Sequence, residues 1–404
     1  MKGSEDAIEP GFHERDTVLS PEIHRRRDRL VARMDHKRLD AIVVASESNV
    51  KYLTGYRSNT WANRARPIVC VLLSSGEVTC FVSAGEATSL EQGAVDVAVI
   101  PYRKPAVVQS GDQMELEFIR AATRALALLL IAQGTRSVGL ELGSHFLPGL
   151  SYAAISELAS SIGPAQFVDV SQELWRLRRT KSPYEVQALT KAAKALGEAY
   201  ALFELSIHPG LSEYELHRCL VRAAMNAGVD QVSYTSVVAD ARISAVGNLT
   251  TRKWRPGNLL SVDAGVVVDG YWADFSRLYA AEPLAPGLAA AYHGLVERLR
   301  GARAAVKVGQ TASHLARLLS ADSEGDVGST FGRQGHGIGL DLTEPPSLDP
   351  LDTTVLSVGM TLCMEPTSFV EGVGFLVAEE EVVVTEHGTD LISPKFPSEL
   401  MVLA

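Results

Sequence analysis

The sequence predicts an α+β protein of two domains, and three observations support this fold class. The chain has 404 residues, 46% of them hydrophobic, which is enough to build two hydrophobic cores. In the first half, short apolar strand segments alternate with helical segments, as they do in α/β domains. The second half combines long helices with a hairpin and a strand-rich final segment. We therefore expect an α/β domain at residues 1–176 and an α+β domain with mainly antiparallel strands at residues 177–404.

The elements of the first domain follow from the spacing of apolar residues. Leu30, Val31 and Met34 recur at helical spacing and predict a helix over residues 24–37. The apolar run at residues 41–44 indicates a buried strand. Further strands are expected at residues 68–73, 78–82, 138 and 167–168, and further helices at residues 116–132 and 150–158.

Helix-capping residues mark the start of the second domain. The charged stretch 174–181 forms the expected boundary. Ser182, Pro183 and Glu185 then provide an N-cap, a first-turn proline and a capping-box glutamate for a helix that continues through Phe203. Later features are a second capping box at Ser212–Glu215, helices at residues 288–306 and 312–319, and turns at Gly372 and Gly388.

The composition argues against a nucleic-acid or membrane partner. A net charge of −10 opposes binding to a polyanion. The acidic first ten residues lack the apolar core of a secretory signal, and no apolar run reaches the length of a membrane span. Cys70, Cys80, Cys219 and Cys363 have no paired spacing, so we expect reduced, buried thiols in a cytoplasmic protein.

The segment 261–279 has the pattern of a tight β-hairpin. The β-branched run Val266–Val268 favours a strand, and Asp269-Gly270 is a pair that the type I′ turn prefers. This turn would pair the two strands outward from Asp269-Gly270, and side chains would alternate between the two faces.

Two aspartates of this hairpin are the first candidate site residues. The predicted register sets Gly265 opposite Asp274 and Asp263 opposite Ser276, so Asp263 and Asp274 are diagonal neighbours on one face. Like charges held this way raise each other's pKa unless they share a proton or a cation neutralises them. The pair therefore indicates a metal site, with a surface hairpin and solvated aspartates as the alternative for this segment alone.

Three further candidate ligands follow along the chain. His336 lies in GHGIGLDLTEPP, Glu365 in GMTLCMEP and Glu379 in VAEEEVVVTEHG. Each glutamate lies in an apolar, strand-like segment, where an unpaired carboxylate is costly. One imidazole and four carboxylates form an oxygen-rich set suited to two divalent ions, which lower the pKa of water and polarise a substrate oxygen.

With these residues in place, the chain resembles the pita-bread metallohydrolases, which include prolidase, aminopeptidase P, methionine aminopeptidase and creatinase. The matching features are the order Asp, Asp, His, Glu, Glu, the ten residues between the aspartates, and the GHGIGL and MEP contexts. The segments 40–56, 181–185 and 209–213 are also similar to the prolidase and creatinase branch. The resemblance implies a creatinase-like amino-terminal domain followed by a pita-bread catalytic domain.

The resemblance also implies a cofactor and its ligands. Two divalent ions would be held by Asp263, Asp274, His336, Glu365 and Glu379, with manganese favoured and iron, cobalt or zinc as alternatives. Asp274 and Glu379 would bridge or chelate the pair.

The choice of Glu379 depends on the register of its strand. The family frame selects Glu379 from the run 379–381, and a slip of one residue would turn a different side chain inward. Glu371, in a loop, is a further alternative.

The family further implies a homodimer. Arg57 and Trp61 lie in the region that often reaches into the partner subunit's site in this family. A surface arginine and a packed tryptophan are the alternative for these two residues.

Two histidines of the proline-specific family members have no counterpart here. One would fall near residues 246–248, but no histidine occurs between His217 and His293, and Thr343 takes the position of the other. A positioned acid or base contributes typically about 10²–10⁴ in rate, so ordinary Xaa-Pro cleavage should be crippled. Because all five ligand positions are kept, we expect a metal-dependent enzyme with a non-standard substrate.

Residues near the ligand segments are candidates for substrate contact, with ordinary packing or surface exposure as the alternative. They are Tyr234, Asn248, Trp272, Arg333 and Thr343. Glu344, which follows Thr343, is a candidate proton acceptor.

The sequence therefore predicts a hydrolase that cleaves an amide or other C–N bond in a small molecule or short peptide, with Glu365 as the proton shuttle. A metal-dependent lyase acting on a small metabolite is one alternative. A non-catalytic binding protein that kept the fold is another. Metal content separates the last hypothesis from the first two, and an unsaturated product would identify the lyase.

Overall fold

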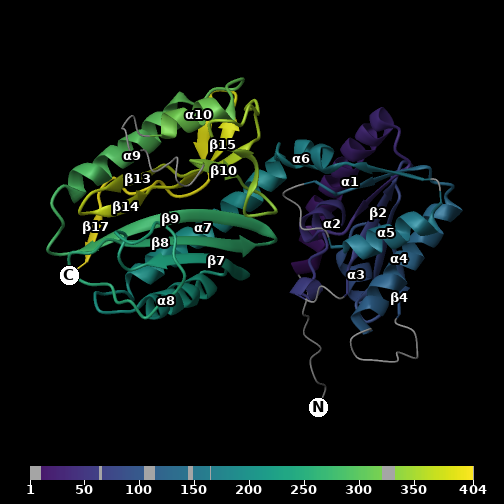
Figure 1. The fold of residues 1–404 in the computed structure, drawn as a ribbon, viewed down its shortest axis with the longest axis horizontal. Coiled ribbons are helices and arrows are strands. Elements are labelled where there is room, and N and C mark those ends of the chain that lie inside the picture. The colour runs from purple at the N-terminus through teal and green to yellow at the C-terminus, as the bar shows by residue number, and fades with distance from the viewer. Residues whose placement is uncertain are drawn as a thin grey trace, which may run out of the picture. The chain divides into compact units, whose positions relative to one another are not determined.

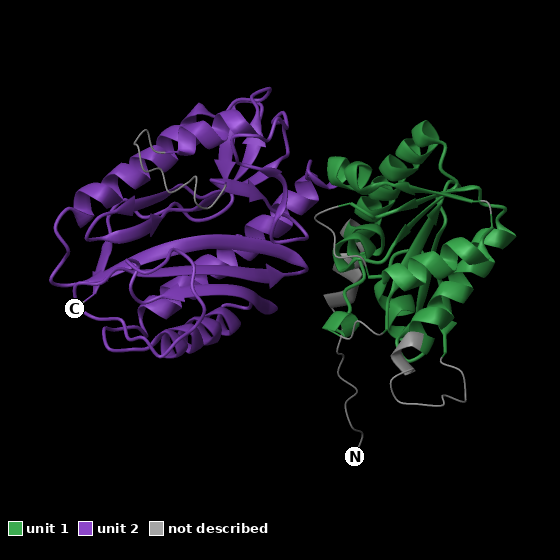
Figure 2. Ribbon diagram, viewed as in Figure 1, with its two compact units in different colours: residues 1–177 green, residues 178–404 purple. Residues whose placement is uncertain are grey.

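The computed structural model describes residues 11–62, 66–103, 114–143, 149–163, 165–320 and 333–403. The chain divides into two compact units, residues 1–177 and 178–404 (Figure 2). The first ten residues, on which the expectation of no secretory signal rests, lie outside the described residues. None of the described helices is long and apolar enough to cross a membrane.

Unit 1 is a mixed sheet with helices around it (Figure 1). Its elements are α1 (Gly11–Lys37), β1 (Ala41–Val44), α2 (Glu47–Thr54), η1 (Thr60–Ala62), β2 (Val69–Leu73), β3 (Val78–Ser83), α3 (Ala87–Gly93), β4 (Ala98–Tyr102), α4 (Met114–Ala132), β5 (Ser137–Leu140), α5 (Tyr152–Ser161), β6 (Gln166–Asp169) and α6 (Ser171–Arg178). The strand order is β4-β3-β2-β1-β5-β6. The pairs β1–β2 and β2–β3 are antiparallel, and the other neighbours are parallel.

The apolar spacing located most of these elements. The predicted strands and helices are present, while α2, α3 and β4 were not predicted. One element start was wrong, because the first helix begins at Gly11 instead of residue 24. The helix α6, in which Leu174 and Trp175 are buried, was not predicted; it overlaps the charged stretch 174–181 where the domain boundary is expected.

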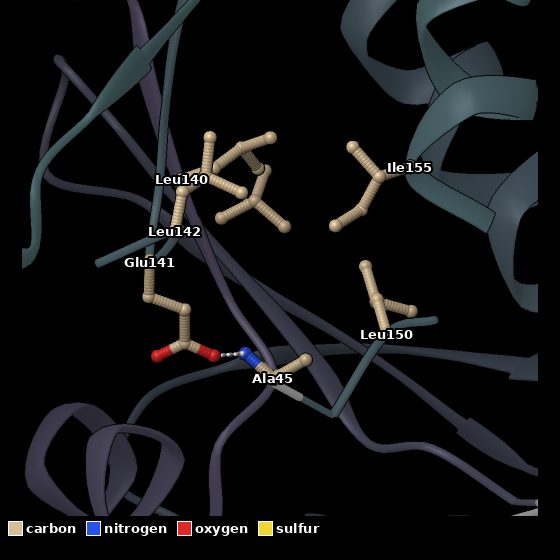
Figure 3. A pocket seen from close by; sticks show the side chains of 7 residues that line it. Ala45, Leu140, Glu141, Leu142, Leu150 and Ile155 are labelled. Carbon is tan, nitrogen blue, oxygen red and sulfur yellow. Dashed lines mark hydrogen bonds between the residues drawn. The ribbon is translucent and has the colours of Figure 1, made fainter. Parts of the chain in front are cut away.

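A buried carboxylate joins the end of β5 to the start of α2. Glu141 accepts hydrogen bonds from the Ala45 amide (2.6 Å), the Ser46 amide and hydroxyl, and the Asn49 side chain (2.7 Å), and Figure 3 shows it directed at Ala45. The neighbouring pocket is otherwise apolar and measures about 10 Å³, roughly the space of one water molecule. We interpret this pocket as a packing gap, and Glu141 as the residue that satisfies the two amides just before α2.

Two cysteines meet across the sheet of unit 1. Cys70 on β2 and Cys80 on β3 are register partners, and 2.8 Å separates their sulfur atoms. All four cysteines are free, and Cys70, Cys80 and Cys363 are buried as predicted, whereas Cys219 is half-buried. The spacing in the sequence did not predict that Cys70 and Cys80 are neighbours.

Unit 2 is built from two sheets and their covering helices (Figure 1). Its elements are α7 (Pro183–Glu204), α8 (Glu213–Asn226), β7 (Gln231–Val238), β8 (Leu260–Val268), β9 (Tyr271–Ala281), α9 (Leu288–Ala305), α10 (Ala312–Leu319), β10 (Gly335–Gly337), β11 (Glu344–Ser347), β12 (Thr361–Met364), β13 (Thr367–Val370), β14 (Gly374–Val377), β15 (Glu380–Thr385), β16 (Gly388–Leu391) and β17 (Met401–Leu403). One sheet has the order β17-β9-β8-β7 and the other β11-β10-β12-β15-β16, while β13 and β14 form a separate pair. Helices α7 and α8 pack on the first sheet, α9 packs on β13, β14 and β16, and β9 contacts β15.

The helix starts of this unit follow the predicted capping chemistry. Ser182 and Glu185 exchange the two hydrogen bonds of a capping box, and Ser212 and Glu215 do the same. Each box satisfies amides that the first turn of a helix leaves unpaired.

Alternation along β12 and β15 separates the core from the site. Leu362, Met364, Val382 and Val384 are buried in the apolar cluster that includes residues of α9 and α10. Because side chains alternate along a strand, the residues between them face the opposite side of the sheet, toward β9. Carboxylates can therefore line one face of these strands without disrupting the core on the other.

Gly335 provides a test of how tightly β10 is held against β12. Its φ is +143°, and an added Cβ would lie 2.1 Å from the carbonyl oxygen of Cys363. We expect Gly335→Ala to lower the free energy of unfolding by about 2–4 kcal/mol in urea titrations, because the backbone must shift and is strained. The matched control is Gly294→Ala, at an open helical position of α9, which should leave stability unchanged or raise it by about 0.5–1 kcal/mol. Equal effects of the two changes would contradict the close packing of β10.

Candidate metal centre

The hairpin that carries the two aspartates has the predicted geometry. Asp269 and Gly270 have φ values of 52° and 82°, as a type I′ turn requires. The register pairs Gly265 with Asp274 and Asp263 with Ser276, which confirms the predicted alignment. The two aspartates therefore lie on the same face of the first sheet, opposite to the face where Phe275 packs against Tyr200 of α7.

The second sheet presents its own polar side chains toward this hairpin. His336 on β10 is the register partner of Cys363 on β12, and Cys363 is the partner of Glu381 on β15. Glu365 lies two residues after Cys363, and Glu379 two residues before Glu381, so all five share one face. The amide of Asp274 donates a hydrogen bond to Glu381, which joins the two sheets at the site.

The distances define a compact cluster. The His336 Nε2 atom lies 3.6 Å from Asp274 Oδ2 and 3.8 Å from Glu365 Oε1. Ligand atoms of Asp274, His336, Cys363 and Glu379 all lie within 4.8 Å of one another. The other ring nitrogen of His336 lies 2.9 Å from the Gly337 carbonyl oxygen. Donation from Nδ1–H to this carbonyl leaves the Nε2 lone pair facing the cluster, which is the arrangement common among metal-binding histidines.

Burial perturbs the pKa of every carboxylate in the cluster. Loss of solvation raises the pKa of Asp274 to about 7 and that of Glu365 to about 7. Burial and the charges of neighbouring carboxylates raise the pKa of Asp263 and Glu379 well above their usual range. Burial lowers the pKa of His336, so its imidazole is neutral at pH 7. Without a cation, the site would therefore hold extra protons.

Several of these buried oxygens have no hydrogen-bond partner among the described residues. They are Oδ1 of Asp263, Oδ1 of Asp274, both carboxylate oxygens of Glu379 and Oε2 of Glu381. A buried carboxylate oxygen normally accepts a hydrogen bond or binds a cation. The donor set of carboxylates and one neutral imidazole fits divalent metal ions.

The three consecutive glutamates have three different environments. Glu379 lies in the cluster with Asp274 and His336. Glu380 points to the opposite side, where it accepts hydrogen bonds from Arg303 of α9 (2.7 Å) and from the Phe396 amide (2.8 Å). Glu381 accepts from Asp274. Glu371, the loop alternative, is exposed between β13 and β14.

Glu344 has an environment that does not suit the predicted proton acceptor. Its carboxylate pairs with Arg178 Nη2 at 2.5 Å and with Lys181 Nζ at 3.0 Å, and all three side chains are buried. It also accepts hydrogen bonds from the amides of Leu340 and Asp341. These two cations hold the pKa of Glu344 down, to about 2, against the effect of burial. A carboxylate with such a pKa is a weak base at pH 7, so we assign Glu344 to fixing the loop after β10.

A cavity of about 210 Å³ adjoins the cluster. Its described lining consists of Tyr234, Ala245, Val246, Ser261, Asp263, Arg333, Glu365, Thr367 and Val377. Tyr234 lies close enough to Asp263 for the two groups to influence each other's pKa, and burial raises the pKa of Tyr234. Arg333 lies with its Nε 3.7 Å from Glu365 Oε1. The cavity therefore gives a small molecule access to the carboxylates.

The other candidates for substrate contact are dispersed. Asn248 is exposed, and Thr343 is half-buried beside Glu344; neither is in the described lining of the cavity. Trp272 lies on β9 beside Gly265, whose added Cβ would come within 3.2 Å of the Trp272 ring. Arg57 and Trp61 are half-buried residues of unit 1, and their role in a partner's site stays a prediction.

Two polar residues of the cluster were not among the predicted site residues. Cys363 and Glu381 each lie two positions from a predicted ligand on the same strand, Glu365 and Glu379 respectively. Alternation of side chains along a strand could have predicted both residues, because positions two apart lie on the same face. Burial and the surrounding carboxylates raise the pKa of the Cys363 thiol well above its usual range.

Two facing sheets enclose a centre of carboxylates and one imidazole, and this arrangement defines the class of protein. Comparison with known families identifies the same class. Residues 26–180 match the creatinase/prolidase N-terminal domain, and residues 187–386 match metallopeptidase family M24. The chain belongs to this metallopeptidase family, with a creatinase-type amino-terminal domain ahead of the M24 domain.

Individual relatives extend over nearly the whole chain. An uncharacterised peptidase of Bacillus subtilis, YqhT, is 25% identical over 90% of this chain and 96% of its own. The Xaa-Pro dipeptidase of Pyrococcus horikoshii is 23% identical over 89% of this chain and 94% of its own. Among solved structures, an Xaa-Pro dipeptidase from Bacillus anthracis has a TM-score of 0.78 at 22% identity and covers 94% of this chain and 100% of its own. This last similarity shows the fold.

The carboxylate of Glu344 provides a stability test. In the wild type its lowered pKa stabilises the fold fully above pH 4.5, and that contribution is lost as the pH falls toward 2. We expect Glu344→Gln to lower the free energy of unfolding at pH 7 by about 3–5 kcal/mol, because the buried ammonium of Lys181 loses its carboxylate. Denaturant titration at several pH values measures this, and the deficit should shrink below pH 4.5.

The control for this test is an exposed ion pair. Glu297→Gln removes a partner of Arg300 on the surface of α9 and should change stability by less than about 1 kcal/mol. A loss of similar size in both variants would contradict the conclusion that Glu344 fixes the loop after β10.

The raised carboxylate pKa values predict an unusual pH dependence for the metal-free protein. The pKa of Asp274 is about 7 in the folded protein and about 3.8 in the unfolded chain, so the folded state binds more protons between these pH values. The free energy of unfolding therefore falls as the pH rises from about 4 to 7. In chelator-treated protein at pH 7, Asp274→Asn should therefore be more stable than the wild type, and the difference should vanish near pH 4. Chemical denaturation at both pH values measures this. Lower stability of the variant at pH 7 would show that the charged carboxylate of Asp274 does not destabilise the metal-free fold.

Proposed function

We propose that this protein is a dinuclear metal-dependent hydrolase that cleaves an amide or other C–N bond in a non-standard substrate. The observation that carries the proposal is the convergence of Asp263, Asp274, His336, Glu365 and Glu379 from two facing sheets, with buried carboxylate oxygens that lack hydrogen-bond partners among the described residues. Membership of the metallopeptidase family supports the same reading.

These five residues would hold two divalent ions, and the family resemblance gives Asp274 and Glu379 as the ligands that the two ions would share. When bound, such ions polarise a substrate carbonyl and lower the pKa of water. Manganese suits the carboxylate-rich part of this set. The remaining requirements of hydrolysis are a group that transfers a proton and a pocket that orients the substrate.

Glu365 is the best candidate for proton transfer. Its side chain is 23% exposed, while Glu379 is 1% exposed, and Glu365 lines the cavity. A carboxylate beside the cavity is placed to transfer protons to and from a bound substrate. We propose that it accepts a proton from the attacking water and delivers it to the leaving nitrogen, which yields an acid and an amine.

Arg333 and Tyr234 are the residues we propose for orienting the substrate and the site. Arg333 is the one cation in the described lining of the cavity and can pair with an anionic group of the substrate. Tyr234 lies beside Asp263 in the lining of the cavity and would orient that carboxylate. Thr343 and Asn248 remain proposed substrate contacts.

A small substrate fits the cavity better than a long peptide does. Its volume of about 210 Å³ is below the range of about 300–1,000 Å³ typical of pockets for drug-sized ligands. Thr343 and the segment near Asn248 provide no imidazole for the proton transfers of ordinary Xaa-Pro cleavage. We also propose a cytoplasmic homodimer in which Arg57 and Trp61 reach the partner's site, as the family pattern suggests.

The test combines metal content with product analysis. Protein purified without added metal, then supplied with manganese, should bind about two ions per chain by mass spectrometry, and Asp274→Ala should lose most of this metal. Asp390→Ala, at an exposed position of β16, is the control and should keep it. Failure of the wild type to bind any of the divalent ions would overturn the proposal.

The reaction class is then decided by the products of an active substrate. A screen of amides, short peptides and small carboxylate-bearing metabolites should give a product that has incorporated ¹⁸O from labelled water. An unsaturated product without ¹⁸O would identify a lyase instead.

A further inference from the structure

Cys363 lies in the metal centre itself, on the polar face of β12. Its register partners are His336 on one side and Glu381 on the other. Leu362 and Met364, its neighbours in sequence, belong to the apolar core on the opposite face. The side chain of Cys363 is fully buried among charged and polar groups, which is an unusual environment for a thiol that serves only as a small apolar residue.

The position of the sulfur atom fits a metal ligand. Sγ of Cys363 and the ligand atoms of Asp274, His336 and Glu379 lie within 4.8 Å of one another. Ligand atoms around a tetrahedral zinc ion are separated by about 3.4–3.7 Å, given zinc–ligand bonds of about 2.0–2.3 Å. An ion at the centre would therefore need to draw the four atoms together by about 1 Å, which small side-chain rotations achieve.

Independent evidence for a cation comes from the carboxylates around this sulfur. Both oxygens of Glu379, which is 1% exposed, lack a hydrogen-bond partner among the described residues, as does Oε2 of the fully buried Glu381. The Cys363 thiol donates one hydrogen bond of 3.7 Å to the Asp274 carbonyl oxygen, a weak bond that deprotonation on ligation would give up.

We propose that Cys363 is an additional ligand of the ion held by Asp274, His336 and Glu379, and that this position prefers zinc or cobalt to manganese. This inference rests on the proposed function, because it specifies the metal of the same centre. On ligation the S–H bond breaks, a sulfur–metal bond forms and the proton leaves to solvent, since a coordinating thiol is deprotonated by the ion. Thiolate sulfur favours zinc, whereas manganese prefers oxygen ligands.

The first experiment compares absorption spectra of the wild type and two cysteine variants. Metal-free wild-type protein titrated with Co²⁺ should develop an intense near-ultraviolet band from sulfur-to-cobalt charge transfer. The band should be absent from Cys363→Ser and retained by Cys219→Ser, which removes a half-buried thiol on α8. Cobalt binding without this band in the wild type would overturn the inference and leave the proposed function standing. No cobalt binding, together with no manganese or zinc binding, would overturn both.

The second experiment measures selectivity by competition with a chelator. Cys363→Ser should weaken zinc affinity by about 10- to 100-fold, the size of effect typical for groups that support a metal site, and should change manganese affinity much less. An equal loss for both ions would show that Cys363 only supports the fold, and unchanged zinc affinity would show that it is not a ligand. Either result overturns the inference. Urea titration of the metal-free variant checks that it is folded.

Discussion

The repulsion among buried carboxylates between two sheets is the constraint on which the rest of unit 2 depends. Burial removes hydration and raises the pKa of Asp263, Asp274 and Glu379, and the charges of neighbouring carboxylates raise the pKa of Asp263 and Glu379 further. Such a cluster is stable only if a cation or protons neutralise it and if the surrounding structure prevents the side chains from moving apart. The architecture supplies the second condition, and a pair of divalent ions would supply the first.

Rigidity comes from the outer faces of the two sheets. The first sheet is fixed by α7, where the Tyr200 hydroxyl donates to the Phe275 carbonyl oxygen at 2.8 Å. The second is fixed by the apolar core under α9 and by Glu344, which two buried cations hold beside the strand that carries His336. Each polar face is thus opposed by a packed apolar face on the same strands. This division lets a charged centre exist inside a protein whose stability comes from burying apolar surface.

The features that the sequence predicted correctly are those set by interactions between residues close in the chain. The Asp269-Gly270 turn sets the hairpin register, and that register alone places Asp263 and Asp274 on one face. The helices after Ser182 and Ser212 were predicted from capping boxes, which involve residues only three positions apart. By contrast, the charged stretch before Ser182 gave no sign of α6, because its helical state depends on burying Leu174 and Trp175. The ion pair of Glu344 with Arg178 could not be predicted for the same reason, since Arg178 is distant in sequence and the pairing is a tertiary contact.

The sequence by itself determined the class of fold, the hairpin, the helix starts and the order of five candidate ligands, because periodicity, turn chemistry and capping act over a few residues. Only the tertiary structure decided how β10, β12 and β15 align, and hence that Cys363 and Glu381 face the same centre as His336. It also decided that Glu344 is an ion-paired brace and that Glu380 points away to Arg303. These outcomes depend on which strands become neighbours. Strand pairing is set by packing over the whole domain, so local sequence patterns do not predict it.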